Sequence, residues 1–530
     1  MIFFFLVCLF VLTSGEPERD TFLYGKFPKD FLFGASTAAF QIEGGWNADG
    51  KGLSIYDVLT HRMPSLFKNQ NAKVAADSYH KYKEDVKILK DYGAKAYRFS
   101  ISWSRVLPNG TADQINQPGI DYYNKLLDEL KANNIEPLVT LYHWDLPFEF
   151  FDIGGWLNES MVGYFNDYAK VCFKYFGSKV KKWITINEPL VIMERHPFYM
   201  KGVISNKTEK SILQYRTMHN LILAHATAYR TYAKEFKGSQ DGEISLALSS
   251  AWGEPKTNSK QDTDAAERYM QFNLGIFAHP IYVDGDYPTV VKEYVAKKSA
   301  AGGIPNRFPS FTAEQKEMVK GSADFFGVNH YDSLLIEYLD FNAGNATPQE
   351  FRKDGDFNTS TSSSWEVTGV YDFKVVPWGM RRLLAFIKRN YKDPAVYVTE
   401  NGCMVPGEYT MTREERLNDD FRISFYRRYI NEALKAHLED RVNLKGYMAW
   451  TLMDNFEWGE GYHATFGLHY INYSDPADRT RVPKKSVSFF KTLIEDNGFV
   501  SKSGGMAIRS TELGFAAGCL LTVLTLKYVA

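Results

Sequence analysis

The sequence predicts an α/β protein built as a single (β/α)₈ barrel. Three observations support this fold class: eight short apolar runs are typical of buried parallel strands, helical patterns separate most of them, and several runs end on a polar motif followed by a turn signal. A length of 530 residues would suggest several domains by the usual rule, but barrels are large single units. Because no linker and no internal repeat divides the runs, one domain is the economical prediction.

Each predicted strand is rich in apolar and β-branched residues, and the eight runs are Phe31–Glu43, Ala94–Trp103, Ile135–Trp144, Val180–Glu188, Glu243–Ser249, Phe325–Tyr331, Ala395–Glu400 and Leu444–Met453. Apolar residues recur at helical spacing in Tyr122–Asn133, Met161–Tyr175, Ile212–Phe236, Met380–Tyr391 and Asn418–Leu438. Two stretches interrupt the alternation. Residues 302–309 are rich in Gly and Pro, residues 358–364 are nearly all Ser and Thr, and both are predicted to be loops on the rim.

The two ends of the sequence differ from the body. Residues 1–15 contain a continuous apolar run from Ile2 to Leu12 followed by small residues, which predicts a cleaved secretory signal peptide. Residues 16–500 are predicted to form the barrel. Residues 501–530 contain a small polar stretch, a spacer and an apolar tail, Leu513 to Leu526. This order is typical of a lipid-anchor signal whose tail is removed, and a retained membrane segment is the alternative.

Composition and cysteine count exclude several classes. The formal net charge of −1 gives no reason to expect nucleic acid as a partner. Of four cysteines, only Cys172 and Cys403 lie in the body, so the chain is not a disulfide scaffold, and no spacing predicts a metal site or cofactor. Cys403 follows a glutamate motif, yet a small apolar filler is favoured over a redox role.

The N-x-Ser/Thr pattern occurs six times and agrees with a secretory route to the cell surface or outside it. These glycosylation candidates are Asn109, Asn158, Asn206, Asn345, Asn358 and Asn472.

Two glutamates far apart in the sequence stand at strand ends. Glu188 lies between an Asn and a Pro at the end of run 180–188, and Glu400 lies between a Thr and an Asn-Gly pair at the end of run 395–400. The loops after the strands build the active site of such barrels, so the fold can bring the two side chains together at the C-terminal ends of the strands. A facing pair of carboxylates is what retaining glycoside hydrolysis requires.

Seven motifs in order resemble those of glycoside hydrolase family 1, the β-glucosidase family, over about Phe27 to Phe490. They are Gln41–Gly45, Tyr97–Arg105, Tyr142–Pro147, Asn187–Pro189, Asn329–Tyr331, Thr399–Gly402 and Asp454–Trp458. Arthropod β-glucosidases and myrosinase-like enzymes are the most similar in appearance. The resemblance implies a retaining β-glycosidase that acts on small O-linked β-D-glucosides, with galactosides and fucosides as further candidates.

The resemblance assigns Glu400 as nucleophile and Glu188 as acid/base. Arg98 and a hydrogen bond from Tyr331 are expected to lower the pKa of Glu400, whereas apolar surroundings and the charge of Glu400 are expected to raise the pKa of Glu188. Taken singly, a strand-end glutamate is usually a solvated rim residue. The joint pattern reverses that expectation.

The resemblance implies that other residues at family motif positions hold the sugar. Without the resemblance, a tryptophan or histidine at such a position would be assigned to the hydrophobic core. The substrate-binding candidates are Gln41, His143, Asn187, Tyr331, Trp450, Glu457 and Trp458, supported by Arg98 and Asn329. Trp378 resembles the wall of the leaving-group pocket, with core packing as the alternative. The stretch 194–198, expected to be a loop beside that pocket, departs from the glycine-rich family pattern.

Three other functions share the fold. The plant type of thioglucosidase replaces the acid/base Glu by Gln, and the insect type holds a sulfate with basic residues. This chain keeps Glu188 and has Glu194 and Leu334 at the apparent sulfate positions. Klotho-like binding proteins lose one or both carboxylates, and both stand here. A transglycosylase would share every catalytic residue. The only membrane contact expected is through the C-terminal tail or its lipid anchor.

Overall fold

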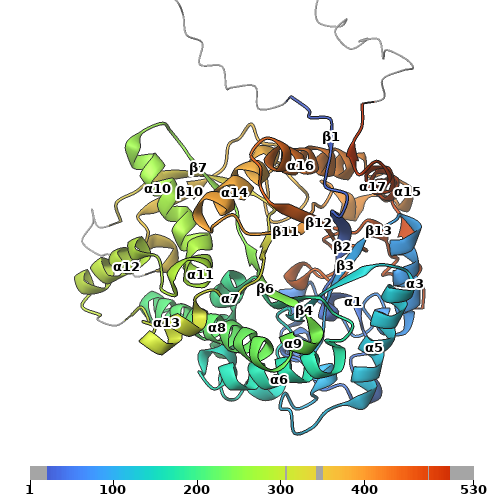
Figure 1. Ribbon diagram of the computed structural model, residues 1–530, viewed down its shortest axis with the longest axis horizontal. Coiled ribbons are helices and arrows are strands. Elements are labelled where there is room, and N and C mark those ends of the chain that lie inside the picture. The colour runs from blue at the N-terminus through green and yellow to red at the C-terminus, as the bar shows by residue number, and fades with distance from the viewer. Residues whose placement is uncertain (1–20, 305–306, 342–349, 476, 502–530) are drawn as a thin grey trace, which may run out of the picture.

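The computed structural model describes residues 21–501 except 305–306, 342–349 and 476. Eight parallel strands close into a barrel in chain order, and the last, β12, pairs with the first, β2 (Figure 1). The strands are β2 (Leu32–Ser36), β3 (Ala96–Ser100), β4 (Glu136–Tyr142), β5 (Lys182–Asn187), β6 (Glu243–Ser249), β8 (Phe326–Asn329), β11 (Val396–Asn401) and β12 (Leu444–Trp450). Each overlaps one predicted run, so the (β/α)₈ barrel is confirmed.

Helices surround the strands (Figure 1). The predicted helices correspond to α5 (Gln117–Ala132), α6 (Met161–Phe176), α8 (Lys207–Glu235), α14 (Pro377–Asn390) and α16 (Asp420–Leu438). Those without a prediction are α2 (Ile55–Arg62), α3 (Ser78–Asp91), α7 (Pro189–Lys201), α10 (Lys260–Met270), α12 (Thr289–Ala301), α13 (Ala313–Val319) and α17 (Lys485–Asp496), beside the short α1 (Ala39–Ile42), α4 (Trp103–Val106), α9 (Lys237–Gln240), α11 (Ile276–His279) and α15 (Arg413–Leu417).

Helix α5 illustrates why these segments are helical. Ile120, Tyr123, Leu127 and Leu130 recur at intervals of three or four and are all buried. Such spacing places apolar side chains on one side of a helix, where they can pack against the barrel. The opposite side keeps charged residues in water.

The first predicted run is longer than its strand. β2 ends at Ser36, and the chain then turns into α1, which carries Gln41. An apolar run of this length does not distinguish a strand from a short buried helix, so the prediction to Glu43 was wrong in its second half.

The Ser/Thr-rich stretch 358–364 is only partly a loop. Its first residues belong to β10 (Phe357–Ser360), which pairs antiparallel with β9 (Ser333–Tyr338). β9 also pairs with β7 (Trp252–Pro255), and this three-stranded sheet lies outside the barrel beside α10 (Figure 1). Because the partner strand comes from a distant segment, local composition could not reveal the pairing. The described residues of 302–309 after α12 have neither helix nor strand, as predicted.

Small and apolar side chains fill the inside of the barrel below the polar residues of the mouth. Strands and strand-flanking residues contribute one buried cluster: Ala96, Leu138, Ile184, Ala247, Phe325, Tyr397 and Met448. This filling makes the barrel a packed core rather than a channel. Cys172 and Cys403 are buried and unpaired, and burial raises the pKa of both thiols, which fits an apolar filler.

The first and last described segments meet at the base of the barrel. β1 (Gly25–Lys26) pairs antiparallel with β15 (Gly498–Phe499). Lys26 and Asn497 line a cavity of about 960 Å³ together with residues at the starts of strands, such as Lys95, Glu136 and Lys181. The β1–β15 pair therefore lies at the base, beside the starts of the strands.

The predicted signal peptide, residues 1–15, lies outside the described residues, and so does the predicted tail from 502 onward. Within the part of the chain that the structure describes, no helix has the length and apolar character needed to span a bilayer.

Candidate active site

The strand ends bring a polar layer together in the mouth of the barrel. Arg98 lies in β3, Asn187 ends β5, Asn329 ends β8, Glu400 lies in β11, and Glu188 follows β5 directly. Each of these five residues is at most 8% exposed. The sequence predicted all five, and the structure places them at one end of the barrel.

Glu400 is held from two sides. Arg98 Nη1 donates to Oε1 at 2.5 Å, and the Tyr331 hydroxyl donates to Oε2 at 2.7 Å, which confirms both predicted contacts. Burial nevertheless raises the pKa of Glu400 above its ordinary value, although Arg98 and Tyr331 act to lower it. Both contacts lower the pKa as predicted, but the loss of hydration on burial outweighs them.

Glu188 occupies an unusual backbone position. Its φ of 47° lies in the left-handed region, and its N–H donates to the Ala247 carbonyl at 2.8 Å just before α7 begins at Pro189. Such a conformation costs a non-glycine residue about 1–3 kcal/mol and persists where the surroundings enforce it. Here the turn from strand to helix directs the carboxyl into the mouth, where Asn329 Nδ2 donates to Oε1 at 2.8 Å.

The two carboxyl groups sit in different electrostatic surroundings. Burial, followed by the negative charge of Glu400, raises the pKa of Glu188 to about 8, as predicted. Glu188 therefore carries a proton at neutral pH. Glu400 alone has the Arg98 guanidinium directly on one oxygen, which favours its ionised form.

A chain of hydrogen bonds fixes the tautomer of His143. Thr399 Oγ1 donates to Asn329 Oδ1 at 2.6 Å, which leaves Asn329 Nδ2 to donate to Asn187 Oδ1 at 3.1 Å. Arg98 Nη2 donates to the same Asn187 oxygen at 2.6 Å, so the amide nitrogen of Asn187 must face His143 Nε2, 3.0 Å away. Because that nitrogen has to accept, His143 is neutral and its proton is on Nδ1.

His143 lies between two tryptophan rings. Its ring stacks on both: the distance between ring centroids is 5.7 Å to Trp450 and 6.0 Å to Trp458. Burial lowers the pKa of His143, and Nδ1 has no partner among the described residues. The sandwich therefore offers a proton donor next to flat aromatic surfaces, a combination that suits a sugar ring.

Glu457 is the third carboxyl group of the site. Gln41 Nε2 donates to its Oε2 at 3.2 Å, and the Tyr371 hydroxyl donates to its Oε1 at 3.3 Å. Burial raises the pKa of Glu457 to about 8. Gln41 Oε1 has no partner among the described residues, so it remains available to a ligand hydroxyl.

Sequence reasoning missed two members of the mouth. Trp144 Nε1 donates to the Asn187 carbonyl at 3.0 Å, and its ring lies 4.6 Å from that of Trp458. Its position inside a predicted motif was the available signal. Tyr371 lies on a turn with φ of 59°, away from every strand end, and no local pattern marks it.

One expectation about the leaving-group side was wrong: the stretch 194–198 is part of helix α7 rather than a loop, and Glu194 Oε2 forms an ion pair with Arg352 Nη2 at 2.7 Å. Trp378 lines a groove with residues such as Trp252 and Arg381. Its place in the wall of the leaving-group pocket stays a prediction.

The predicted glycosylation sites differ in exposure. Asn206 and Asn358 are exposed, and Asn109, Asn158 and Asn472 are half-buried. Asn345 lies outside the described residues.

Comparison with known proteins places this geometry in a family. Residues 23–499 match the family described as Glycosyl hydrolase family 1. The chain belongs to glycosyl hydrolase family 1. Myrosinase 1 of Brevicoryne brassicae is 44% identical over 88% of this chain and 98% of its own length. The human cytosolic β-glucosidase is 44% identical over 89% of this chain and 98% of its own.

A longer family 1 relative and two solved structures complete the comparison. Human lactase/phlorizin hydrolase is 44% identical over 93% of this chain, which spans only 25% of that protein. An aphid myrosinase structure superposes with a TM-score of 0.82 at 43% identity, covering 89% of this chain and all of that one. A rice β-glucosidase structure gives a TM-score of 0.82 at 36% identity, covering 88% and 98%. Members of family 1 named as β-glucosidases and as myrosinase are thus similar over nearly the whole barrel.

Proposed function

We propose that this protein is a retaining β-glycosidase that hydrolyses O-linked β-D-glucosides through a covalent glycosyl-enzyme intermediate. The observation that carries the proposal is the contrast between the two carboxyl groups. Glu188 keeps its proton to a pKa of about 8, whereas Glu400 faces the Arg98 guanidinium at 2.5 Å. An acid and a nucleophile need these opposite states at the same pH.

In the first step a Glu400 oxygen forms a bond to the anomeric carbon while the bond from that carbon to the leaving oxygen breaks. The proton of Glu188 passes to the leaving oxygen. Arg98 and Tyr331 hold Glu400 in one orientation, so little freedom is lost as the reaction proceeds.

In the second step the roles of Glu188 reverse. Glu400 has become an ester and lost its charge, so the repulsion that helped to raise the pKa of Glu188 is gone. Glu188 then accepts a proton from water, whose oxygen bonds to the anomeric carbon as the ester bond breaks. Two inversions at one carbon return the original β-configuration.

The sugar would be held by Gln41, His143, Glu457 and the indole N–H of Trp458, with Trp450 as the flat wall. Asn187 is oriented by Arg98 and Asn329 and is proposed to bind the 2-hydroxyl group. Buried polar groups discriminate strongly, because a substrate lacking one hydroxyl leaves its partner unpaired. Glucosides are favoured because relatives named β-glucosidases share the barrel.

An O-glycoside is favoured over a thioglucoside because Glu188 is placed to supply a proton. An alkoxide leaving group needs that proton, whereas a stabilised thiolate does not. The charge of Glu194 is matched by Arg352, so this pair presents no net positive charge to a sulfate.

The test is product stereochemistry on a substrate panel. Proton NMR of early product should show β-glucose from 4-nitrophenyl β-glucoside before mutarotation, because the mechanism retains configuration. Alkyl β-glucosides, galactosides, fucosides and a glucosinolate complete the panel, and glycosyl transfer to added alcohols detects transglycosylation. Early α-glucose would refute retention, faster cleavage of the glucosinolate would establish a thioglucosidase, and no turnover would favour a binding protein.

We also propose that the protein travels through the secretory pathway and is held at the cell surface by a lipid anchor added near Ser503 or Gly504. Small residues suit the transfer site, and the 14-residue stretch Leu513 to Leu526 is short beside the ~20 residues a span needs. Phosphatidylinositol-specific phospholipase C should release active enzyme from intact expressing cells, with a transmembrane-anchored protein as the unreleased control. A peptide containing residues 520–526 in the mature membrane fraction would contradict the anchor.

A further inference from the structure

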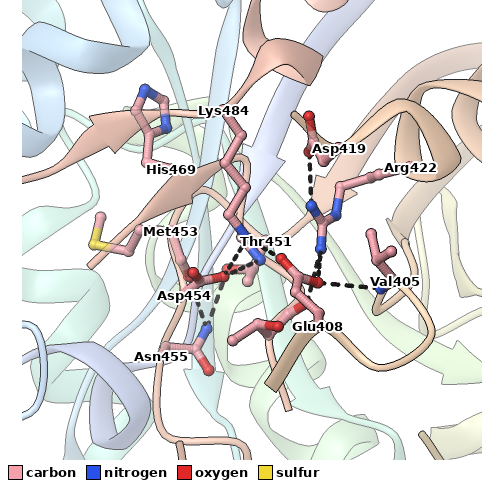
Figure 2. A network of polar contacts seen from close by, with 12 residues as sticks. Val405, Glu408, Asp419, Arg422, Thr451, Met453, Asp454, Asn455, His469 and Lys484 are labelled. Atoms are coloured by element: carbon pink, nitrogen blue, oxygen red, sulfur yellow. Dashed lines mark hydrogen bonds and ion pairs between the residues drawn. The ribbon is translucent and has the colours of Figure 1, made fainter. Parts of the chain in front are cut away.

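Five charged side chains form a buried network beside the mouth (Figure 2). They are Glu408, Asp419, Arg422, Asp454 and Lys484, and each is at most 2% exposed. They come from the segment after β11, from the start of α16, from the segment after β12, and from the turn before α17. The network thus joins two segments: the one that follows Glu400 and the one that precedes Glu457.

Arg422 organises the segment after Glu400. Its Nη2 donates to Glu408 Oε2 at 2.6 Å, and its Nε donates to the Cys403 carbonyl at 3.2 Å. Nη1 donates to Asp419 Oδ2 at 2.6 Å, and Nη2 also donates to the Thr465 carbonyl at 2.9 Å. These contacts fasten the loop that begins at Gly402, two residues after Glu400.

Lys484 connects that loop to the other one. Its Nζ donates to Glu408 Oε1 at 2.7 Å and to Asp454 Oδ1 at 2.9 Å (Figure 2). Its own backbone N–H donates to the Leu468 carbonyl at 2.9 Å, so its position is fixed. One ammonium group therefore holds carboxylates from both loops.

A further series of contacts leads from Asp454 to the carboxyl group of Glu457, which is proposed to face the sugar. Asn455 follows Asp454 directly, and its Oδ1 accepts a hydrogen bond from Gln41 Nε2 at 3.1 Å. The same Gln41 nitrogen donates to Glu457 Oε2 at 3.2 Å. A shift of Asp454 would therefore move both Glu457 and the side chain that orients it.

The composition of the network argues for a role beyond stability. Three carboxylates and two cations are buried together, and burying charge is usually no more stabilising than well-packed apolar residues. Asp454 Oδ2 has no partner among the described residues. A buried, hydrogen-bonded ion pair can hold its loops in one geometry, and a carboxyl group that reads sugar hydroxyls needs such support.

We propose that Lys484 is a positioning residue: through Asp454 it sets the place of Glu457 and thereby the selectivity for sugar hydroxyls. The proposal rests on the sugar-binding role proposed above for Glu457. It assigns no contact with substrate to Lys484. It predicts that removing the ammonium group changes which hydroxyl the site recognises, rather than weakening all sugars alike.

The test compares four variants. Lys484→Met removes the ammonium group, and Asp454→Asn removes the same ion pair while keeping the side-chain shape, in case the first variant fails to fold. Glu457→Gln supplies the reference pattern. Lys298→Met is the matched control, because Lys298 is a completely buried lysine paired with Asp356 and is not one of the five residues of the network.

Two readouts are measured for glucose and its 3-, 4- and 6-deoxy analogues: binding by tryptophan fluorescence, and kcat and KM for the matching 4-nitrophenyl β-glycosides. Lys484→Met and Asp454→Asn are expected to lower the preference for the hydroxyl that Glu457→Gln identifies by between about ten- and a hundredfold, as a misplacement on the ångström scale does. Preferences at the other positions and in Lys298→Met should stay unchanged.

Uniform losses across the panel in both Lys484→Met and Asp454→Asn, or the same pattern in Lys298→Met, would overturn the proposal. The binding readout separates this result from a failure of the proposed function. A wild-type protein that binds glucose without hydrolysing the glucoside would refute the glycosidase, while the binding preferences would still decide the role of Lys484. A protein that binds none of the sugars would refute both.

Discussion

Replacing Glu400 by glutamine is expected to lower kcat/KM for β-glucosides by about 10⁴-fold or more, which is about 5.5 kcal/mol of transition-state stabilisation. The amide oxygen is a far weaker nucleophile than the carboxylate, so the covalent intermediate cannot form at a useful rate. The substitution preserves shape: the amide oxygen can still accept from Arg98, and the amide nitrogen can donate to the Tyr331 hydroxyl oxygen. The melting temperature should therefore stay close to that of the wild type.

Kinetics and labelling check the assignment together. A 2-deoxy-2-fluoro glucoside should form a stable ester on Glu400 in the wild type, and peptide mapping should locate it. Asp85→Asn is a useful control, because Asp85 is a buried carboxylate paired with Arg481 away from the mouth. It should alter stability without abolishing turnover. A label on any other residue would end the assignment of Glu400.

Replacing Glu188 by alanine is expected to have an effect that depends on the leaving group. Alkyl glucosides should lose about 10²–10⁴-fold in kcat/KM, because the leaving oxygen no longer receives a proton. A dinitrophenyl glucoside, which leaves without protonation, should lose far less. Added azide should restore turnover and give a β-glucosyl azide, since an anionic nucleophile needs no base. Equal losses across leaving groups would contradict the role.

The same variant should change the pH profile in a defined direction. Wild-type activity requires protonated Glu188, so kcat/KM should fall as pH rises through about 8, the pKa that burial and the Glu400 charge produce. The acid side should reflect ionisation of Glu400, displaced upward by burial. Because Glu188 and Glu400 interact, the two apparent pKa values of the pH profile describe the pair rather than either residue alone. With the dinitrophenyl glucoside, Glu188→Ala should lose the alkaline limb and keep the acid one.

The strands and the central site were predictable because their signals are local. Each barrel strand is a short apolar run that ends in a polar motif, and parallel strands of a closed barrel place all such ends at one mouth. The places of Glu188 and Glu400 follow from these strand ends. The roles of Arg98, Asn187 and Asn329, and the contacts of Glu400 with Arg98 and Tyr331, follow instead from the resemblance to family 1.

The remaining features depend on distant parts of the chain. β10 is a strand because β9 lies beside it, not because of its own Ser and Thr residues. Tyr371 reaches Glu457 from a left-handed turn that no periodicity marks. The direction of the Glu400 pKa shift depends on the balance between its burial, which raises the pKa, and its contacts with Arg98 and Tyr331, which lower it. The sequence contains the two contact partners, but it does not show how deeply Glu400 is buried.

The pairing of β1 with β15 has a consequence for how the enzyme meets its substrates. β1 and β15 lie beside the starts of the strands, while Glu188 and Glu400 open at the opposite end. Before β1 the described chain lies along α16, where Leu23 bonds to Asn431 and the Arg427 guanidinium lies over the Phe22 ring. The two termini of the described chain are therefore neighbours on the outer, helical side of the barrel rather than in its mouth. A purification tag or immobilising linker at either terminus should leave turnover unobstructed.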